Sequence, residues 1–147
     1  MREAHFMAKP IHDAQRHFIL SGSMHMSENQ LLTLSKSFAV DIIELCESLR
    51  KRKKASAIIS QLLRSGTGIG ANIHEANYAS SRADFINKFQ IALKECYETE
   101  YWLDVFLKSQ ILAQPEFDRV ISQCTKLRRL LIASITTAKN NRGSFDE

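Results

Sequence analysis

The feature that most constrains the fold of this chain is a glycine-containing stretch at residues 60–79, SQLLRSGTGIGANIHEANYA. Apolar and small residues recur there at alternating intervals of three and four positions, at Ile59, Leu62, Gly66, Ile69, Ile73, Ala76 and Ser80. This spacing puts them on one face of an α-helix, and it is typical of a helix packed almost parallel to its neighbours. We therefore predict a helix over residues 55–79 that is one member of a helix bundle.

Three glycines, Gly66, Gly68 and Gly70, alternate inside this predicted helix. Each costs about 1 kcal/mol relative to alanine in a helix interior, so they need a compensating role. A phosphate-binding loop is disfavoured, because G-T-G-I-G lacks the G-x-G-x-x-G spacing, follows no strand and has no G-K-[ST] beside it. We instead predict close helix contacts, with Gly66 on the seam and Gly70 one turn later at its edge.

Asn72 and Glu75 flank Ile73 on the same predicted helix. We interpret them as helix-packing residues, a polar pair that fixes helix register or bonds across a bundle or subunit interface. A catalytic carboxylate with an amide helper is disfavoured, because no second acid, histidine and metal set converges with them. The sequence also has no nucleophile–base pair and no cofactor motif, so we predict a protein that is not an enzyme and needs no cofactor.

Two blocks of sequence resemble a known family. They are residues 61–76, QLLRSGTGIGANIHEA, and residues 81–107, SRADFINKFQIALKECYETEYWLDVFL. Both are similar to the small bacterial four-helix-bundle proteins encoded in intervening sequences of 23S ribosomal RNA genes, and the resemblance spans about residues 28–140. Gly68 stands where serine is more usual in that family, and His74 where arginine or a small residue is more usual.

The resemblance implies a four-helix bundle that assembles into a ring-shaped homopentamer. It also implies a partner that is structured RNA or another nucleic acid. The same family includes the accessory variability proteins of diversity-generating retroelements, which implies a reverse transcriptase as an alternative partner.

Periodicity along the rest of the chain predicts three more helices. Ser27 with Gln30 and Ser81 with Asp84 are capping signatures, and Pro115 occupies a favoured position in a first helical turn. The four predicted helices cover residues 27–52, 55–79, 81–111 and 115–140. We predict an all-α, antiparallel up-down-up-down four-helix bundle over residues 27–140, with a poorly ordered N-terminal extension at 1–26 and a C-terminal tail at 141–147.

The third predicted helix is apolar on a broad face, because Ile86, Leu93 and Leu107 widen its seam. A face this wide fits either a helix that touches two neighbours in the bundle or one that touches another subunit. Tyr97 and Tyr101 lie one turn apart on the same helix. They could stack on nucleic-acid bases, or they could serve in packing, as aromatic residues on helices more often do.

Cysteine and histidine usage argues against a metal site. Cys46, Cys96 and Cys124 fall on three different predicted helices and form no C-x-x-C pair, so we predict buried free thiols. No histidine pair at i, i+4 occurs in residues 1–26, where four of the five histidines lie. No apolar run approaches the ~20 residues that span a membrane, and residues 1–20 do not resemble a signal peptide, so we expect a cytoplasmic protein.

The formal charge of +4 is unevenly distributed. Residues 50–64 carry no acid, whereas the third predicted helix is rich in acids, at Glu95, Glu98, Glu100 and Asp104. Basic clusters indicate either a polyanion partner or a solvated surface with cations near a helix C-terminus. The candidate phosphate contacts are Arg50, Lys51, Arg52, Lys53, Lys54, Arg64, Arg128 and Arg129.

Two functions follow as hypotheses. The first is a homo-oligomer, with a pentamer favoured, that binds RNA or DNA through its basic surface without catalysis. The second is a protein-binding scaffold, for example an accessory factor of a reverse transcriptase in a diversity-generating retroelement.

Overall fold

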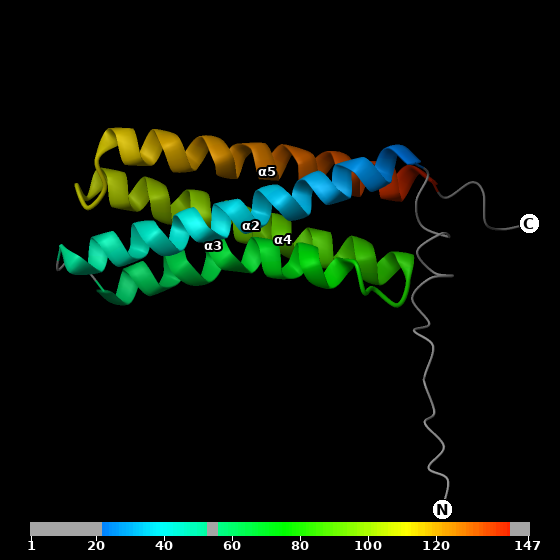
Figure 1. The fold of residues 1–147 in the computed structure, drawn as a ribbon, viewed down its shortest axis with the longest axis horizontal. Helices are drawn as coiled ribbons and strands as arrows, with labels where there is room; N and C mark the ends of the chain where they lie inside the picture. The colour runs from blue at the N-terminus through cyan, green and yellow to red at the C-terminus, as the bar shows by residue number, and fades with distance from the viewer. Residues whose placement is uncertain (1–21, 53–55, 142–147) are drawn as a thin grey trace, which may run out of the picture.

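The computed structural model describes residues 22–52 and 56–141, and within these ranges it consists of helices without strands. The four helices are α2 (Gly22–Lys51), α3 (Ser56–Ala76), α4 (Arg82–Lys108) and α5 (Gln114–Asn140) (Figure 1). Each packs against the next in the chain, and α5 closes the bundle against α2. The end of α2, the start of α3 and the α4–α5 link lie at one end of the bundle, and the α3–α4 link lies at the other (Figure 1). The predicted up-down-up-down bundle is confirmed.

Three helix boundaries differ from the sequence prediction by more than one residue. Helix α2 begins at Gly22 rather than Ser27, so the helix includes the Gly22–Ser23 pair that we expected to precede it. Helix α3 ends at Ala76, and Ser80 is therefore exposed in the following link instead of continuing the buried seam. Helix α4 ends at Lys108 rather than near residue 111. Residues 1–21 and 142–147 and the Ser27 side chain lie outside the described part of the chain.

The cap of α4 uses the predicted residues, whereas that of α5 uses Ala113 and Glu116, which were not predicted to cap it. At α4, the Ser81 hydroxyl accepts a hydrogen bond from the Asp84 N–H at 3.1 Å. At α5, the Glu116 carboxylate accepts from the Ala113 N–H at 3.0 Å, and the helix begins at Gln114, one residue before Pro115. Because these bonds satisfy N–H groups that have no partner within the helix, they fix where each helix begins.

The core is a continuous apolar layer supplied by all four helices. From α3 it takes the predicted seam up to Ala76. Cys46, Cys96 and Cys124 are buried free thiols, as predicted. Burial raises the pKa of Cys46 to about 11, so the thiol stays protonated and packs as a small apolar group.

The glycines of α3 lie at close helix contacts, as predicted. A Cβ atom added at Gly66 would lie 2.9 Å from both Cγ atoms of Ile42 on α2, and one at Gly70 would lie 3.3 Å from the Ser35 carbonyl oxygen. Gly68 points instead toward α4, where an added Cβ would lie 3.3 Å from the Glu95 side chain. The alternating glycines therefore bring α3 close to both of its neighbours.

The predicted polar pair on α3 divides between two roles. Glu75 forms an ion pair with Lys88 of α4, so it bonds across the bundle. Asn72 instead donates to the Gly68 carbonyl oxygen at 2.8 Å within its own helix. A buried bond from the Thr99 hydroxyl of α4 to the Ser65 hydroxyl of α3, at 3.0 Å, links these helices and was not predicted.

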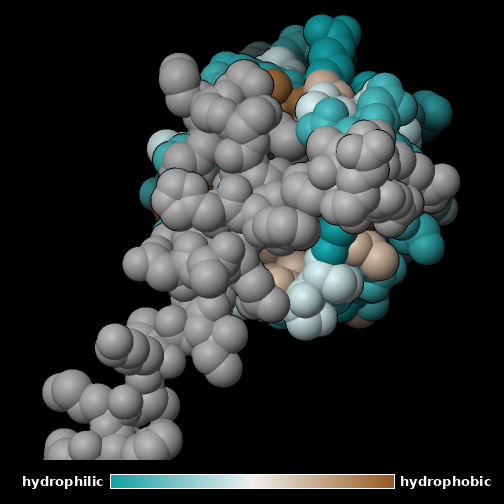
Figure 2. All heavy atoms as spheres, turned by 90° about the vertical axis from the view of Figure 1, so that its right-hand side faces the viewer, coloured by the Kyte–Doolittle hydropathy of each residue, from teal (hydrophilic) through white to brown (hydrophobic). Residues whose placement is uncertain are grey.

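The broad apolar face of α4 is used inside the bundle, because α4 packs against both α3 and α5. Ile86 and Leu93 are half-buried against the core, which confirms contact with two neighbours. Figure 2 views the bundle from the end that holds the α3–α4 link, where hydrophilic residues dominate the coloured surface. Among the helices of the described ranges, none is both long and apolar enough to cross a membrane.

Candidate nucleic-acid interface

The last turn of α2 carries two exposed cations, Arg50 and Lys51. Arg50 Nη2 donates to the Ser60 hydroxyl of α3 at 3.2 Å, a neutral partner that leaves its charge uncompensated. Lys51 forms no ion pair within residues 22–52 and 56–141. Lys53 and Lys54, predicted to extend this cluster, lie outside the described residues. Both described cations are therefore available to an anionic partner.

Arg52 is held by a carboxylate instead. Its guanidinium lies 2.7 Å from Glu116 Oε1, at the start of α5. Partial burial works against the charged form of Glu116, but the bonds from the Ala113 N–H and from Arg52 hold its pKa below the ordinary value. The Arg52 charge is thus partly neutralised by an acid that also caps α5.

Arg64 lies beside two glutamates of α4. It forms an ion pair with Glu98 and a longer one with Glu95, at 3.5 Å. The bond to Glu98 raises the pKa of Arg64, and the same bond is the main reason that the pKa of Glu98 is lowered. Trp102 Nε1 also donates to Glu98, at 3.3 Å. The Arg64 charge is therefore paired with carboxylates across the α3–α4 interface.

Glu95 has an unusual environment for a carboxylate. The pKa of Glu95 is raised, mainly because burial removes water from the carboxylate. The nearby Arg64 charge acts in the opposite direction and lowers this pKa. The Oε2 atom of Glu95 is buried and has no hydrogen-bond partner in the described part of the chain. The absence of a side chain at Gly68 provides the space that this carboxylate occupies against α3.

Arg128 and Arg129 are neighbours on α5 but face different surroundings. Arg128 Nε donates to Glu100 of α4 at 2.8 Å, and its guanidinium carbon lies over the Tyr97 ring, 5.7 Å from the centroid. The bond to Glu100 raises the pKa of Arg128. Arg129 is exposed and has no carboxylate partner within the described ranges.

The predicted phosphate contacts therefore separate into two groups. Three are paired with carboxylates, namely Arg52, Arg64 and Arg128. Three others, Arg50, Lys51 and Arg129, carry no such pair among the described residues. The acids of α4 were identified from the sequence but were not paired with Arg64 and Arg128, and Glu116 of α5 was not paired with Arg52. The sequence feature that could have indicated the pairs of α4 is the spacing of its acids. Glu95 and Glu98 are three positions apart and so lie on one side of α4, while Glu100 faces the other side.

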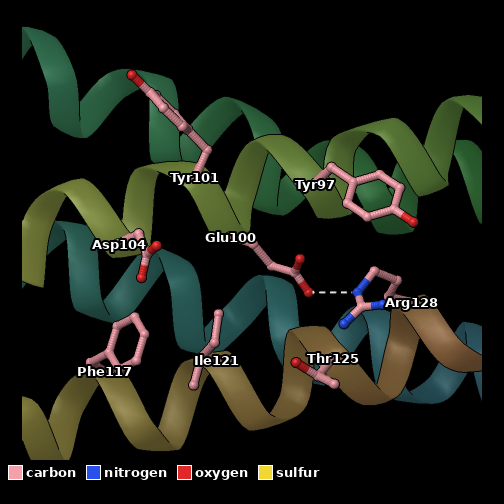
Figure 3. Close-up of a pocket in the computed structure, with 8 residues that line it drawn as sticks. All are labelled: Tyr97, Glu100, Tyr101, Asp104, Phe117, Ile121, Thr125 and Arg128. Carbon is pink, nitrogen blue, oxygen red and sulfur yellow. Dashed lines mark hydrogen bonds and ion pairs between the residues drawn. The ribbon is translucent and has the colours of Figure 1, made fainter.

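A groove that sequence analysis did not predict runs between α4 and α5, with a volume of about 450 Å³ (Figure 3). The α4 side supplies tyrosines and acids, and the α5 side supplies apolar residues, a hydroxyl and an arginine. These residues are Tyr97, Glu100, Tyr101, Asp104, Phe117, Ile121, Thr125 and Arg128. In Figure 3 the Glu100–Arg128 bond spans the groove, and Asp104 and Phe117 face each other farther along it.

The described side chains do not assemble a metal site. No group of three or more histidine, cysteine, aspartate or glutamate side chains within residues 22–52 and 56–141 could hold a metal ion. The groups that converge in these ranges are instead arginine–carboxylate pairs and aromatic rings.

Comparison with known families places these features in context. The family model for the 23S rRNA-intervening sequence protein matches residues 27–133. The chain belongs to this family. The match includes the α3 glycines and all the arginine–carboxylate pairs described above, so the resemblance seen in the sequence is confirmed.

A solved structure shares the fold of this family member. It is described as a protein with unknown function from the S23 ribosomal protein family of Bacteroides thetaiotaomicron. The two chains are 43% identical, with a TM-score of 0.73, and the match covers 75% of this chain and 98% of the other. A search of curated proteins finds no match to this chain.

Proposed function

We propose that this family member binds nucleic acid without catalysis, through residues 50–54, which begin in the last turn of α2 and are named the basic end of α2. The observation that carries the proposal is that Arg50 and Lys51 are exposed side by side without a carboxylate partner among the described residues. A cation already paired with a carboxylate must exchange that partner for a phosphate, whereas Arg50 and Lys51 need not. Such contacts position a nucleic acid without reading its sequence.

The proposal includes a homo-oligomer, with a pentamer favoured by the family resemblance. Each copy would repeat the basic end of α2, so that weak contacts to one long nucleic acid add up through high effective concentration. Light scattering at micromolar concentration should give a mass several times that of one chain, and a monomer mass would contradict this part of the proposal. A nucleic-acid partner also agrees with a cytoplasmic location.

The test is a fluorescence titration of structured RNA and duplex DNA over a series of salt concentrations. The variant replaces Lys51, Lys53 and Lys54 by glutamine. Each lost phosphate contact should reduce the slope of log affinity against log salt by about 0.9 for duplex DNA and about 0.7 for single strands. The matched control replaces Lys36, Lys126 and Lys139 by glutamine. These lysines are exposed outside the basic end of α2, so the control removes the same formal charge as the first variant.

A reduced slope in the first variant and an unchanged slope in the control would support the basic end of α2 as the binding surface. Equal reductions in both would indicate a general charge effect. If neither variant changes binding, the interface moves to the exposed Arg129. If the wild-type protein binds neither nucleic acid at physiological salt, the proposal fails and the protein-scaffold function takes its place.

A further inference from the structure

The outward surface of α4 carries a regular line of aromatic and charged residues. Lys94, Tyr97, Tyr101, Asp104 and Lys108 follow one another at intervals of three and four, which places them along one face of the helix. Tyr97 and Tyr101 are 50% and 60% exposed. The packing role that aromatic residues usually have on helices therefore does not account for this pair. We name these five residues the tyrosine stripe.

Neighbouring side chains hold both tyrosine rings without covering them. The Arg128 guanidinium lies over Tyr97 and is itself fixed by Glu100, so one face of that ring is supported while half of the side chain remains exposed. Tyr101 meets Trp102 edge to face, with 5.1 Å between ring centroids. Rings held in this way lose little conformational freedom when a ligand stacks on them.

The charges beside the rings suit a nucleic acid. Lys94 precedes the tyrosines and Lys108 follows them, and both lysines are exposed. Lys94 has no carboxylate partner in the described part of the chain, whereas Lys108 lies 4.0 Å from Asp104 in an exposed ion pair that a phosphate would replace. Aromatic rings for bases combined with cations for phosphates is the arrangement that binds single-stranded nucleic acids. Asp104 lines the α4–α5 groove together with both tyrosines, and once Lys108 contacts a phosphate, the Asp104 carboxylate oxygens can accept hydrogen bonds from the amino groups of bases.

We infer that the tyrosine stripe is a binding site for unpaired bases of single-stranded nucleic acid. One base stacks on Tyr97 and another on Tyr101, and the phosphates on either side contact Lys94 and Lys108. Four residues of helix separate the rings by about 6 Å along the axis, so each ring can take a separate base. The inference rests on the proposed function and adds to it a second surface, with unpaired bases as its ligand.

The chain contains a reporter for this site, because its single tryptophan, Trp102, lies against Tyr101. The probes are a short single-stranded oligoribonucleotide without self-complementarity, the single-stranded DNA of the same sequence, and the corresponding duplex. We expect the single strands to quench Trp102 fluorescence more strongly than the duplex. The two single-stranded probes show whether the site also depends on the 2′-hydroxyl groups of RNA.

Substitution of each ring separates stacking from other contacts. Tyr97→Leu and Tyr101→Leu should each weaken binding of a labelled single strand by about 5-fold to about 150-fold, the range for loss of one base–aromatic stack. Tyr97→Phe and Tyr101→Phe keep the ring and should bind as wild type does. The matched control is Tyr78→Leu, since Tyr78 is also exposed but lies in the α3–α4 link. Circular dichroism melts of all variants verify that the fold is intact.

Several outcomes would overturn the inference. If the leucine variants bind single strands as tightly as wild type while the Lys51, Lys53 and Lys54 variant loses duplex binding, the proposed function stands and the stripe is not a base site. If the leucine variants lose oligomerisation by light scattering, the stripe is a subunit interface. If wild type binds no nucleic acid of any kind, both proposals fail together.

Discussion

The interfaces of α3 differ from the interface between α4 and α5 in how far side chains hold the helices apart. Toward α2, a Cβ atom added at Gly66 would overlap Ile42, and one added at Gly70 would press on the Ser35 backbone. Toward α4, Gly68 lets the Glu95 side chain lie against the α3 backbone. Helices α4 and α5 contain no glycine, and long side chains such as Arg128 and Phe117 line a groove of about 450 Å³ between them.

The difference decides which side chains of each interface are buried and which remain at the surface. Close packing of α3 against α4 buries the hydrogen bond that the Thr99 hydroxyl donates to Ser65. The α4–α5 side instead keeps aromatic and charged groups at the surface. Close packing at α3 therefore contributes mainly to stability, whereas the α4–α5 side leaves Tyr97 and Tyr101 exposed.

The largest expected effect is at the closest contact. Gly66→Leu should lower the free energy of unfolding by about 1–3 kcal/mol, the usual cost of overpacking, even though removing a helical glycine returns about 1 kcal/mol. The reason is that Ile42 is fully buried and β-branched, so it cannot easily move from the added Cβ. Thermal or urea unfolding measures the change.

A second substitution sharpens this test. Ile42→Ala alone should destabilise the bundle by leaving a cavity, but combined with Gly66→Leu it should cost less than the sum of the two changes. Strict additivity, or a Gly66→Leu protein that melts at or above the wild-type temperature, would show that α2 and α3 do not meet closely at this position.

A smaller effect is expected where α3 meets α4. Burial raises the pKa of Glu95, so its charged form is less favourable in the folded state, and this penalty disappears as the pH falls through the raised folded-state pKa. Glu95→Gln should therefore stabilise the protein at neutral pH, by about 1 kcal/mol or less because the bond from Arg64 is also weakened.

The pH dependence of the Glu95→Gln effect tests whether burial of the Glu95 charge is the cause of the gain in stability. The gain over wild type should shrink as the pH falls from neutral toward the ordinary range of a glutamate. Urea unfolding of both proteins across this range measures it. A destabilised variant at neutral pH would mean that the pairing with Arg64 outweighs the burial of Glu95, and that this contact stabilises the α3–α4 interface.

The smallest effect is expected on the open side. Thr125→Leu adds volume to a half-buried position that lines the α4–α5 groove, where the new side chain has space. We expect a change in unfolding free energy within about 0.5 kcal/mol, as for most substitutions away from the core. The same unfolding experiment compares it with Gly66→Leu. A loss as large as that of Gly66→Leu would contradict the difference between the two sides.

Much of the fold could be predicted from local patterns. The seam of α3 up to Ala76, the cap at Ser81, the close contact at Gly66 and the buried cysteines all follow from the spacing and chemistry of nearby residues. The start of α2 was misplaced, because Gly22 and Ser23 indicate a break locally, yet the helix includes both.

The candidate interface was less predictable, because charge along a sequence does not show which charges meet. Arg64 lies 31 positions from Glu95, and Arg128 lies 28 positions from Glu100. Only the register of antiparallel helices brings these groups together. The sequence correctly located positive charge but could not show which cations are already neutralised.

The sequence by itself determined that this chain forms a bundle of four helices, because periodic apolar residues must be buried together and three helical glycines need close neighbours to offset their cost. Only the tertiary structure decided which charged and aromatic side chains remain accessible. The rotation of α4 between α3 and α5 directs Glu95 and Glu98 inward to one neighbour and Glu100 to the other, and leaves Tyr97 and Tyr101 facing outward. That rotation depends on the packing of all the helices together, since each apolar face must find its partner.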